Sequence, residues 1–267
     1  MRPRNQVQSV DSAAAPREPG RSPGTPKLWQ EAYQRIREQI LRGDFPLGSP
    51  LSRRKLAAEC RMSLLPISEA LRRLELDGFV ETEARAGTRV RIPTPRDVEQ
   101  QTIVRTALEC ESARLFCERA SGEDRKDLLA RAEHLDHLRA HSGNLTPGEP
   151  LVYAVRSYHI EFHLRIADGA GCGALRKLLE QNQVLALNWL YDIAAGNFSM
   201  PPPSHADLAR VLAGDDPDEA ARAIRAHIWY GWDNLVREFS ARYWKDGDLE
   251  SAPVRRWRGS ISIANAT

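Results

Sequence analysis

The chain has 267 residues, which is room for two domains of ordinary size, and its formal net charge is only +2. No apolar run approaches the ~18 residues of a membrane span, and the first residues do not read as a secretory signal. The four cysteines show no CxxC pairing, which favours free thiols in a reducing compartment. We therefore expect a cytoplasmic protein without a membrane partner.

The charge is unevenly distributed along the chain. Residues 1–92 contain 17 Lys and Arg against 11 Asp and Glu, whereas the remainder contains 21 against 25. A basic first part and an acidic second part indicate one module that faces a polyanion and one with another role.

Residues 1–26 are rich in Pro, Gly, Ser, Ala and Arg and have almost nothing to bury, which predicts a disordered tail. Helical spacing of apolar residues begins after Lys27 and ends at Gly43. The turn-rich segment DFPLGSP follows. The apolar positions that predict this first helix are Leu28, Ala32, Ile36, Ile40 and Leu41.

Residues 53–78 predict two short helices joined at Arg61 and Met62, with Ser63 as the cap of the second helix. The buried face of that helix follows the i, i+3, i+4, i+7 rule and consists of Ile67, Ala70, Leu71 and Leu74. The opposite face carries Leu64, Ser68 and Arg72, and the shorter helix opens with Arg53, Arg54 and Lys55. Such a pair is typical of a helix-turn-helix that docks on DNA; the alternative is an αα-hairpin inside any helical protein.

The segment 79–92 predicts two short strands around a turn near Ala86 and Gly87, because Val90 and Ile92 alternate with arginines. A winged helix-turn-helix has this order of elements, three helices followed by a basic hairpin. We therefore expect a DNA-binding domain over residues 27–92.

The prolines at positions 93 and 95 predict a domain boundary. Beyond them we expect about six helices, over residues 97–120, 123–141, 150–167, 172–195, 204–213 and 217–239. Short breaks between helices favour an antiparallel bundle. The predicted fold is therefore mainly α: a winged helix-turn-helix, a helical domain over residues 97–240 and a weakly patterned tail over residues 241–267.

Several segments resemble the GntR family of bacterial transcription regulators, in its FadR-like branch with an FCD ligand-binding domain. They are AYQRIREQILRGDFPLGSPLS, RKLAA, PISEALRRLELDGFVE and GTRV in the first domain, and VRTALECESARL, FHLRIADGAG and SHADLARVLAGDDPDEAARAIRAHI in the second. Six helices fit the family's shorter VanR-type variant. The resemblance implies a homodimer, usually a repressor, that binds a near-palindromic operator on double-stranded DNA and responds to a small metabolite.

Family positions for DNA contact match Arg54, Ser63 and Gly87, but Leu64 and Ser68 replace two arginines that the family uses at the DNA surface. The second helix of the pair is therefore poor in the arginines that recognise guanine. We expect Leu64 and Leu65 to touch thymine methyl groups. Phosphate contacts are expected from Arg53, Arg54, Lys55, Arg72 and, in the wing, Arg89.

Four histidines predict a ligand cluster in the helical domain. His159 and His163 are four apart on one helix and share a face, and 21 residues separate His205 from His227. The FCD metal pattern is D-x3-H followed by two further histidines. His163, His205 and His227 match its histidines, and His159 stands where the family has Asp. Imidazoles suit Zn²⁺ best, with Ni²⁺ or Cu²⁺ as further candidates, over Mg²⁺. The alternative is hydrogen-bonded pocket histidines without a metal.

Losing that carboxylate would leave the metal charge without compensation from the protein and strengthen its pull on an anionic effector. Arg105 occupies the family's R-x3-E position, with Glu109 following, and is the candidate that binds an effector carboxylate. The alternative is a surface ion pair between the two residues. A further group, His134, His137 and His141, is expected on a solvated face.

Two other functions remain open from the sequence. A metal-dependent hydrolase is one, but the only acid or base recognised near the four histidines is Glu161, which at i+2 points away from the His159 face. The other is a DNA-binding dimer that senses nothing. A regulator without enzymatic activity is the favoured interpretation.

Overall fold

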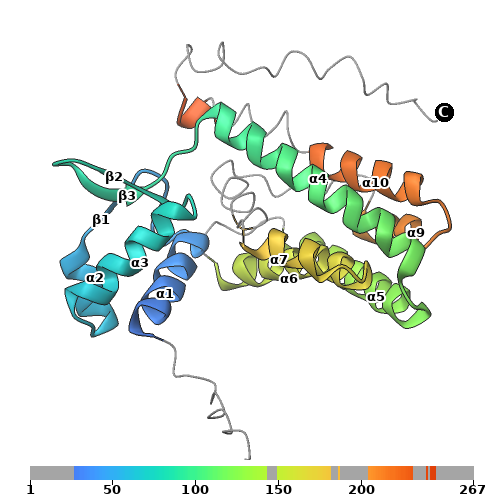
Figure 1. Ribbon diagram of the computed structural model, residues 1–267, viewed down its shortest axis with the longest axis horizontal. Helices are drawn as coiled ribbons and strands as arrows, with labels where there is room; N and C mark the ends of the chain where they lie inside the picture. The colour runs from blue at the N-terminus through green and yellow to red at the C-terminus, as the bar shows by residue number, and fades with distance from the viewer. Residues whose placement is uncertain are drawn as a thin grey trace, which may run out of the picture.

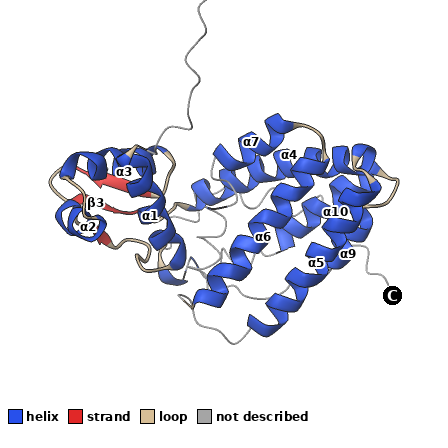
Figure 2. Cartoon of the chain, turned by 90° about the horizontal axis from the view of Figure 1, so that it is seen from below, coloured by secondary structure: helices blue, strands red, loops and turns tan. Residues whose placement is uncertain are grey.

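The computed structural model describes residues 27–142, 149–181, 186, 204–230, 239 and 241–244. One part contains three helices and a small sheet, and the other is built of helices; the two lie side by side (Figures 1 and 2). The mainly α fold with an N-terminal winged helix-turn-helix is confirmed. No helix among the described residues combines the length and apolarity that a membrane crossing requires.

The first part begins with the three predicted helices, α1 Leu28–Arg42, α2 Arg53–Cys60 and α3 Leu64–Leu76. Gly43 ends α1 with φ +87°, a left-handed conformation that glycine adopts without a steric penalty. Arg61 ends α2 in the same region, with φ +54°. Ser63 does occupy the N-cap of α3, but its side chain makes no capping hydrogen bond there.

The wing is a three-stranded antiparallel sheet in the order β1-β3-β2. The strands β2 Val80–Glu83 and β3 Gly87–Val90 are the predicted hairpin, with Val80 opposite Val90. The turn between them spans residues 84–86, slightly earlier than expected, and places Arg85 at φ +71°. The edge strand β1, Pro50–Leu51, was not predicted, because two residues carry no periodicity.

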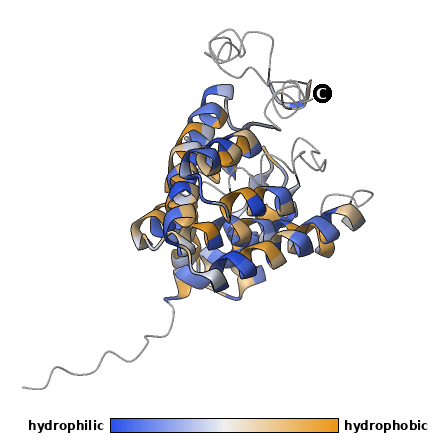
Figure 3. Cartoon of the chain, turned by 90° about the vertical axis from the view of Figure 1, so that its right-hand side faces the viewer, coloured by the Kyte–Doolittle hydropathy of each residue, from blue (hydrophilic) through white to orange (hydrophobic). Residues whose placement is uncertain are grey.

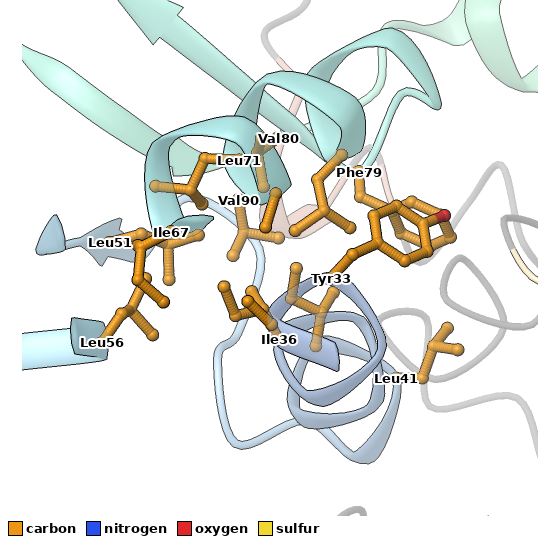
Figure 4. Packing of buried hydrophobic residues seen from close by; sticks show 14 of the residues in the cluster. Tyr33, Ile36, Leu41, Leu51, Leu56, Ile67, Leu71, Phe79, Val80 and Val90 are labelled. Atoms are coloured by element: carbon orange, nitrogen blue, oxygen red, sulfur yellow. The ribbon is translucent and has the colours of Figure 1, made fainter. Parts of the chain in front are cut away.

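The core of this part lies between α1, α3 and the sheet (Figure 4). The predicted buried face of α3 is confirmed: its four apolar side chains are all 3% exposed or less. They meet Ile36 of α1, Phe79 directly before β2 and Val90 of β3. Each fully buried Ile, Leu or Phe contributes roughly 1.5–3 kcal/mol, so this small core holds the three helices in place.

Six helices make up the described residues of the second part: α4 Pro95–Arg119, α5 Gly122–Ser142, α6 Pro150–Gly169, α7 Gly173–Gln181, α9 His205–Leu212 and α10 Pro217–Tyr230. Four of the predicted helices are confirmed to within two residues at each end. The helices predicted to end at residues 195 and 239 are described to Gln181 and Tyr230, and most of the residues between these points and the predicted ends lie outside the described part of the chain.

Helix α4 packs along α10, and α5 packs against α6 and α9 (Figure 1). Hydrophobic and hydrophilic residues are both present along the helices, as the hydropathy colouring in Figure 3 shows. Their apolar sides form a second core around Phe116, Leu128 and Phe162. A capping box between Thr94 and Asp97 fixes the start of α4, directly after the predicted boundary.

The two parts are in contact through α1 and α6. Tyr153 and Ile160 of α6 pack against the core of the first part, and the Arg42 guanidinium lies 4.8 Å from the centre of the Tyr153 ring. Near the C-terminus, Trp244 is buried in the same core and donates a hydrogen bond to the Pro93 carbonyl at 2.7 Å. The segment expected as a tail from residue 241 therefore begins with packed residues.

Candidate functional site

The exposed side of α3 is apolar at its start. Leu64 is 51% exposed and Leu65 is 79% exposed, and Ser68 lies farther along the same helix, half-buried. Two exposed leucines lower solubility unless a partner covers them. This placement agrees with the predicted contact to thymine methyl groups, which itself stays a prediction.

The first turn of α2 consists of three exposed cations, Arg53, Arg54 and Lys55. This turn contains no acidic residue. Cations at a helix N-terminus oppose the helix dipole by about 0.3–1 kcal/mol each. Ser52 offsets part of this by accepting a hydrogen bond from the Lys55 amide at 3.4 Å. An arrangement that is locally unfavourable favours a role in binding phosphate.

Two further arginines among the predicted DNA contacts have glutamate partners that the sequence interpretation did not consider. Arg72 donates to Glu69 at 2.7 Å, and Arg89 donates to Glu81 at 2.7 Å and also contacts Glu83. Exposed pairs of this kind are weak, so a phosphate can take the place of the glutamate. The exposed Gly87 opens the strand that carries Arg89.

The four predicted histidines meet inside the helical part. His159 and His163 come from α6, His205 opens α9 and His227 lies in the last turn of α10. Neighbouring ring centres are 4.7 Å apart for His159 and His163, and 4.9 Å apart both for His159 and His205 and for His205 and His227. We call these four residues the histidine cluster. His163 and His205 are 1% and 0% exposed, so the cluster is an interior feature.

Asp136 of α5 accepts three hydrogen bonds at the start of α9, two of them from His205. Its Oδ1 lies 2.7 Å from the imidazole Nδ1 and accepts from the His205 amide at 3.1 Å, while Oδ2 accepts from the Ala206 amide at 2.9 Å. Because Nδ1 is engaged, the other ring nitrogen, Nε2, is the one directed to the cluster. That nitrogen is buried and has no hydrogen-bond partner among the described residues.

Glu109 of α4 stands behind His163 in a similar way. Its Oε2 is in direct contact with His163 Nδ1, close enough for an ion pair but not aligned as a hydrogen bond. Its other oxygen accepts from Arg105 Nε at 2.6 Å, and Arg105 Nη2 lies 3.4 Å from His163 Nε2. The ion pair named as an alternative for Arg105 is therefore present. It is buried rather than on the surface, and it borders the cluster.

Burial keeps the imidazoles of His159, His205 and His227 neutral. Desolvation, together with the charges of neighbouring groups, places the pKa values of His159 and His227 well below the usual range. Desolvation also lowers the pKa of His205 to about 4, although Asp136 opposes the shift. Burial works against ionisation of Glu109, but Arg105 and His163 together outweigh it and lower its pKa to about 2. The cluster thus presents lone pairs, as a metal site requires.

The donor geometry fits a transition metal. His159, His205 and His227 each offer a nitrogen, and these three atoms lie within 4.8 Å of one another. His163 is outside that set, but its Nε2 lies 2.9 Å from Nε2 of His159. Two nitrogens bound ~2.1 Å from one zinc ion stand ~3.0–3.4 Å apart, so any of these nitrogens that are farther apart would have to approach one another to share an ion. The unpartnered nitrogens of His205 and His227 point to the same use.

The two carboxylates correct the sequence interpretation. It recognised only Glu161 near the cluster, and Glu161 is exposed on α6. It also expected a bound metal charge to lack compensation from the protein, whereas Glu109 and Asp136 lie directly behind two imidazoles. Glu109 was visible as the partner of Arg105. No local pattern marks Asp136, because its contact with His205 joins residues 69 positions apart.

The second histidine group behaves as expected where it is described. His134 and His137 are exposed on α5, and His134 makes an edge contact with Tyr158 at 5.1 Å between ring centres. The side chain of His141 lies outside the described residues.

Comparison with protein families gives two matches that together span most of the chain. A model described as "Bacterial regulatory proteins, gntR family" matches residues 28–90, and a model described as "FCD domain" matches residues 102–229. The first match covers the winged helix-turn-helix, and the second contains every residue of the histidine cluster.

Individual proteins are similar at lower identity. The chain is 26% identical over 197 residues to the "Probable D-xylose utilization operon transcriptional repressor" of Paenarthrobacter nicotinovorans, covering 71% of this chain and 80% of that protein. It is also 26% identical over 197 residues to the "Nta operon transcriptional regulator" of Aminobacter aminovorans, covering 72% and 87%.

Two solved structures share the fold. McbR/YncC of E. coli superposes with a TM-score of 0.62 at 16% identity, covering 80% of this chain and all of that one. A GntR transcriptional regulator from Rhodococcus sp. RHA1 gives the same TM-score at 20% identity, covering 80% and 98%. At these identities the likeness shows the fold alone.

Proposed function

The chain belongs to the GntR family of bacterial transcriptional regulators, which are not enzymes, and we propose that it is a metal-dependent sensor of a small carboxylate. In this proposal a homodimer binds a near-palindromic operator and represses transcription. A carboxylate that enters the histidine cluster changes the affinity for that operator. The DNA-binding domain spans residues 27–92, and the sensing and dimerising domain spans residues 97–240.

The observation that carries the sensing role is the convergence of four imidazoles from three helices in the interior of the FCD domain. Buried, neutral and partly unpartnered nitrogens are costly to maintain without a ligand. All-nitrogen donors favour Zn²⁺, with Ni²⁺ or Cu²⁺ as competitors, over Mg²⁺. An ion held by these histidines would supply a positive charge that attracts carboxylate oxygens.

Positive side chains beside the cluster support a carboxylate as the effector. Arg105 Nη2 lies 3.4 Å from His163 Nε2, and the charges of Arg105 and Arg139 both help to lower the pKa of His227. Two guanidinium groups therefore border the space where an anion would bind. Arginine offers a planar pair of donors that matches a carboxylate.

Helix α6 supplies a route from the cluster to DNA. It carries His159 and His163, and it contacts α1 through the ring of Tyr153, which lies under Arg42. We propose that cluster occupancy changes the position of α6 and so favours one orientation of the DNA-binding domains in the dimer.

The DNA-binding role is tested by selecting duplexes from a randomised library with the full-length chain. We expect a two-fold symmetric consensus and, by light scattering, two chains per duplex. Affinity should fall steeply with salt, because Arg53, Arg54 and Lys55 release counterions from phosphate. An asymmetric consensus bound by one chain, or an affinity insensitive to salt, would contradict this.

The sensing role is tested by metal analysis of the purified chain, combined with thermal shift in acetate, malonate, succinate and citrate. Stabilisation by a carboxylate is expected in the zinc-loaded protein and should disappear in EDTA. If the protein binds its operator but responds to neither zinc nor any carboxylate, the sensing role is contradicted. The protein would then be the alternative named from the sequence, a DNA-binding dimer that senses nothing.

A further inference from the structure

Two carboxylates from helices that contribute no histidine to the cluster each contact one of its imidazoles. Asp136 comes from α5 and contacts His205; Glu109 comes from α4 and contacts His163. Both approach the Nδ1 atom, on the side of the ring away from Nε2. The histidine cluster, formed from α6, α9 and α10, is thereby tied to two further helices.

The contact to Asp136 fixes the state of His205. A hydrogen bond of 2.7 Å to a carboxylate places the proton on Nδ1 and leaves the lone pair on Nε2. That Nε2 is buried and has no partner among the described residues. An imidazole held in this tautomer is ready to bind a metal, and such outer partners orient the ligands of many metal sites.

Capping of α9 accounts for two of the three hydrogen bonds of Asp136, those from the His205 and Ala206 amides, but not for the contact with the imidazole. The start of α9 already has a capping box, in which Ser204 accepts from the Asp207 amide at 3.2 Å and donates to its carboxylate at 2.8 Å. The contact from Asp136 to the His205 ring is additional to that cap. Helix formation alone therefore leaves the ring contact unexplained.

Glu109 likewise does more than neutralise Arg105. One oxygen accepts from Arg105 at 2.6 Å, and the other is turned to His163 Nδ1. The Glu109 side chain is only 3% exposed, so it acts on the cluster at short range and with little screening by water. Like Asp136, it approaches the Nδ1 atom of one imidazole, although this contact is not aligned as a hydrogen bond.

We infer that Glu109 and Asp136 are positioning residues of the metal site, which together supply the negative charge that His159, in place of an acidic ligand, does not provide. The inference rests on the proposed metal site. Each carboxylate holds one imidazole with its Nε2 toward the ion. The protein thus keeps all-nitrogen ligands, which favour zinc. The compensating charge lies on carboxylates that contact the imidazoles rather than the ion.

The test compares neutral variants of these residues with matched controls. Asp136→Asn and Glu109→Gln keep size and remove charge. Glu133→Gln on α5 and Glu111→Gln on α4 change exposed glutamates paired with surface arginines. Zinc affinity of the full chain is measured by competition with a chromophoric chelator, and the melting temperature of the metal-free protein is recorded in parallel.

We expect zinc affinity to fall about 10–100-fold in Asp136→Asn and Glu109→Gln, with the number of ions per chain unchanged, and to stay within twofold in the controls. Bound Co²⁺ should show an altered visible spectrum in the two variants, reporting a changed ligand arrangement. Asp136→Glu should recover part of the affinity that Asp136→Ala loses.

Three results would overturn the inference in distinguishable ways. If both variants bind zinc as the wild type does, the positioning role fails and the metal site stands. If they melt at lower temperature without metal but keep their zinc affinity, the carboxylates serve the fold only. If the wild-type chain does not bind zinc, the proposed metal site fails and the inference with it.

Discussion

At the scale of single residues, two exposed leucines mark the proposed base-reading surface more than any cation does. Leu64 and Leu65 are the exposed side chains at the start of α3, whereas Arg72 and Arg89 are paired with glutamates. Apolar side chains recognise thymine through its methyl group, while arginine recognises guanine through two hydrogen bonds. The operator should therefore be rich in thymine at the position that faces Leu64.

Replacing Leu64 by arginine tests this assignment. We expect Leu64→Arg to create a preference for guanine at that position, worth about 1–3 kcal/mol over the other bases. The measurement is selection of duplexes from a random library by the variant and the wild type. Leu76→Arg is the matched control, since Leu76 is 67% exposed at the other end of α3. An unchanged consensus in Leu64→Arg would mean that this helix does not read bases there.

At the scale of elements, the spacing of apolar residues correctly predicted the helices whose limits depend on residues nearby in the sequence. The buried face of α3 and the positions of α4, α5, α6 and α9 result from apolar spacing, capping residues and Gly or Pro breaks. The edge strand β1 and the contact between Asp136 and His205 were missed, because each depends on partners distant in sequence. Four histidines could be predicted as a group, but the carboxylates behind them needed the three-dimensional packing of α4 and α5.

The crossing of α6 and α4 depends on Gly169, which no sequence pattern singled out. A Cβ at this position would lie 2.4 Å from Cε2 of Phe116, a ring that is fully buried. We expect Gly169→Ala to lower the free energy of unfolding by about 1–3 kcal/mol, since the ring has to move within a packed core. Thermal or denaturant unfolding gives the value.

Gly122→Ala provides the control for this prediction, because a Cβ at Gly122 meets no atom within 4 Å. Its effect should stay within about 0.5 kcal/mol. Equal stability of both variants and the wild type would show that α6 and α4 do not approach as closely as described.

At the scale of the whole molecule, α6 connects the histidine cluster to the winged helix-turn-helix. Its contact with α1 is small and centres on Tyr153 and Arg42, whose guanidinium lies 4.8 Å from the ring centre. Cation–π contacts of this kind are worth about 0.5–2 kcal/mol, which matches the scale of allosteric coupling. Changing this contact should alter communication between the sites more than either binding step.

We expect Tyr153→Leu to leave zinc affinity and operator affinity near wild type and to weaken the effect of a carboxylate on operator binding. Arg42→Ala should act in the same way, and the double variant should add little, because both remove one contact. Fluorescence anisotropy with labelled operator gives operator affinity and its carboxylate response, and chelator competition gives zinc affinity. Full carboxylate response in Tyr153→Leu would place the coupling elsewhere.

The central claim is that a metal held by the histidine cluster makes operator binding responsive to a carboxylate. The most direct measurement is the operator affinity of the full chain with zinc or EDTA, with and without the carboxylate that stabilises it best. We predict at least about a fivefold change on adding the carboxylate to the zinc-loaded wild type, and none in EDTA or in His205→Ala. A carboxylate response of the same size without zinc, or in His205→Ala, would contradict the account.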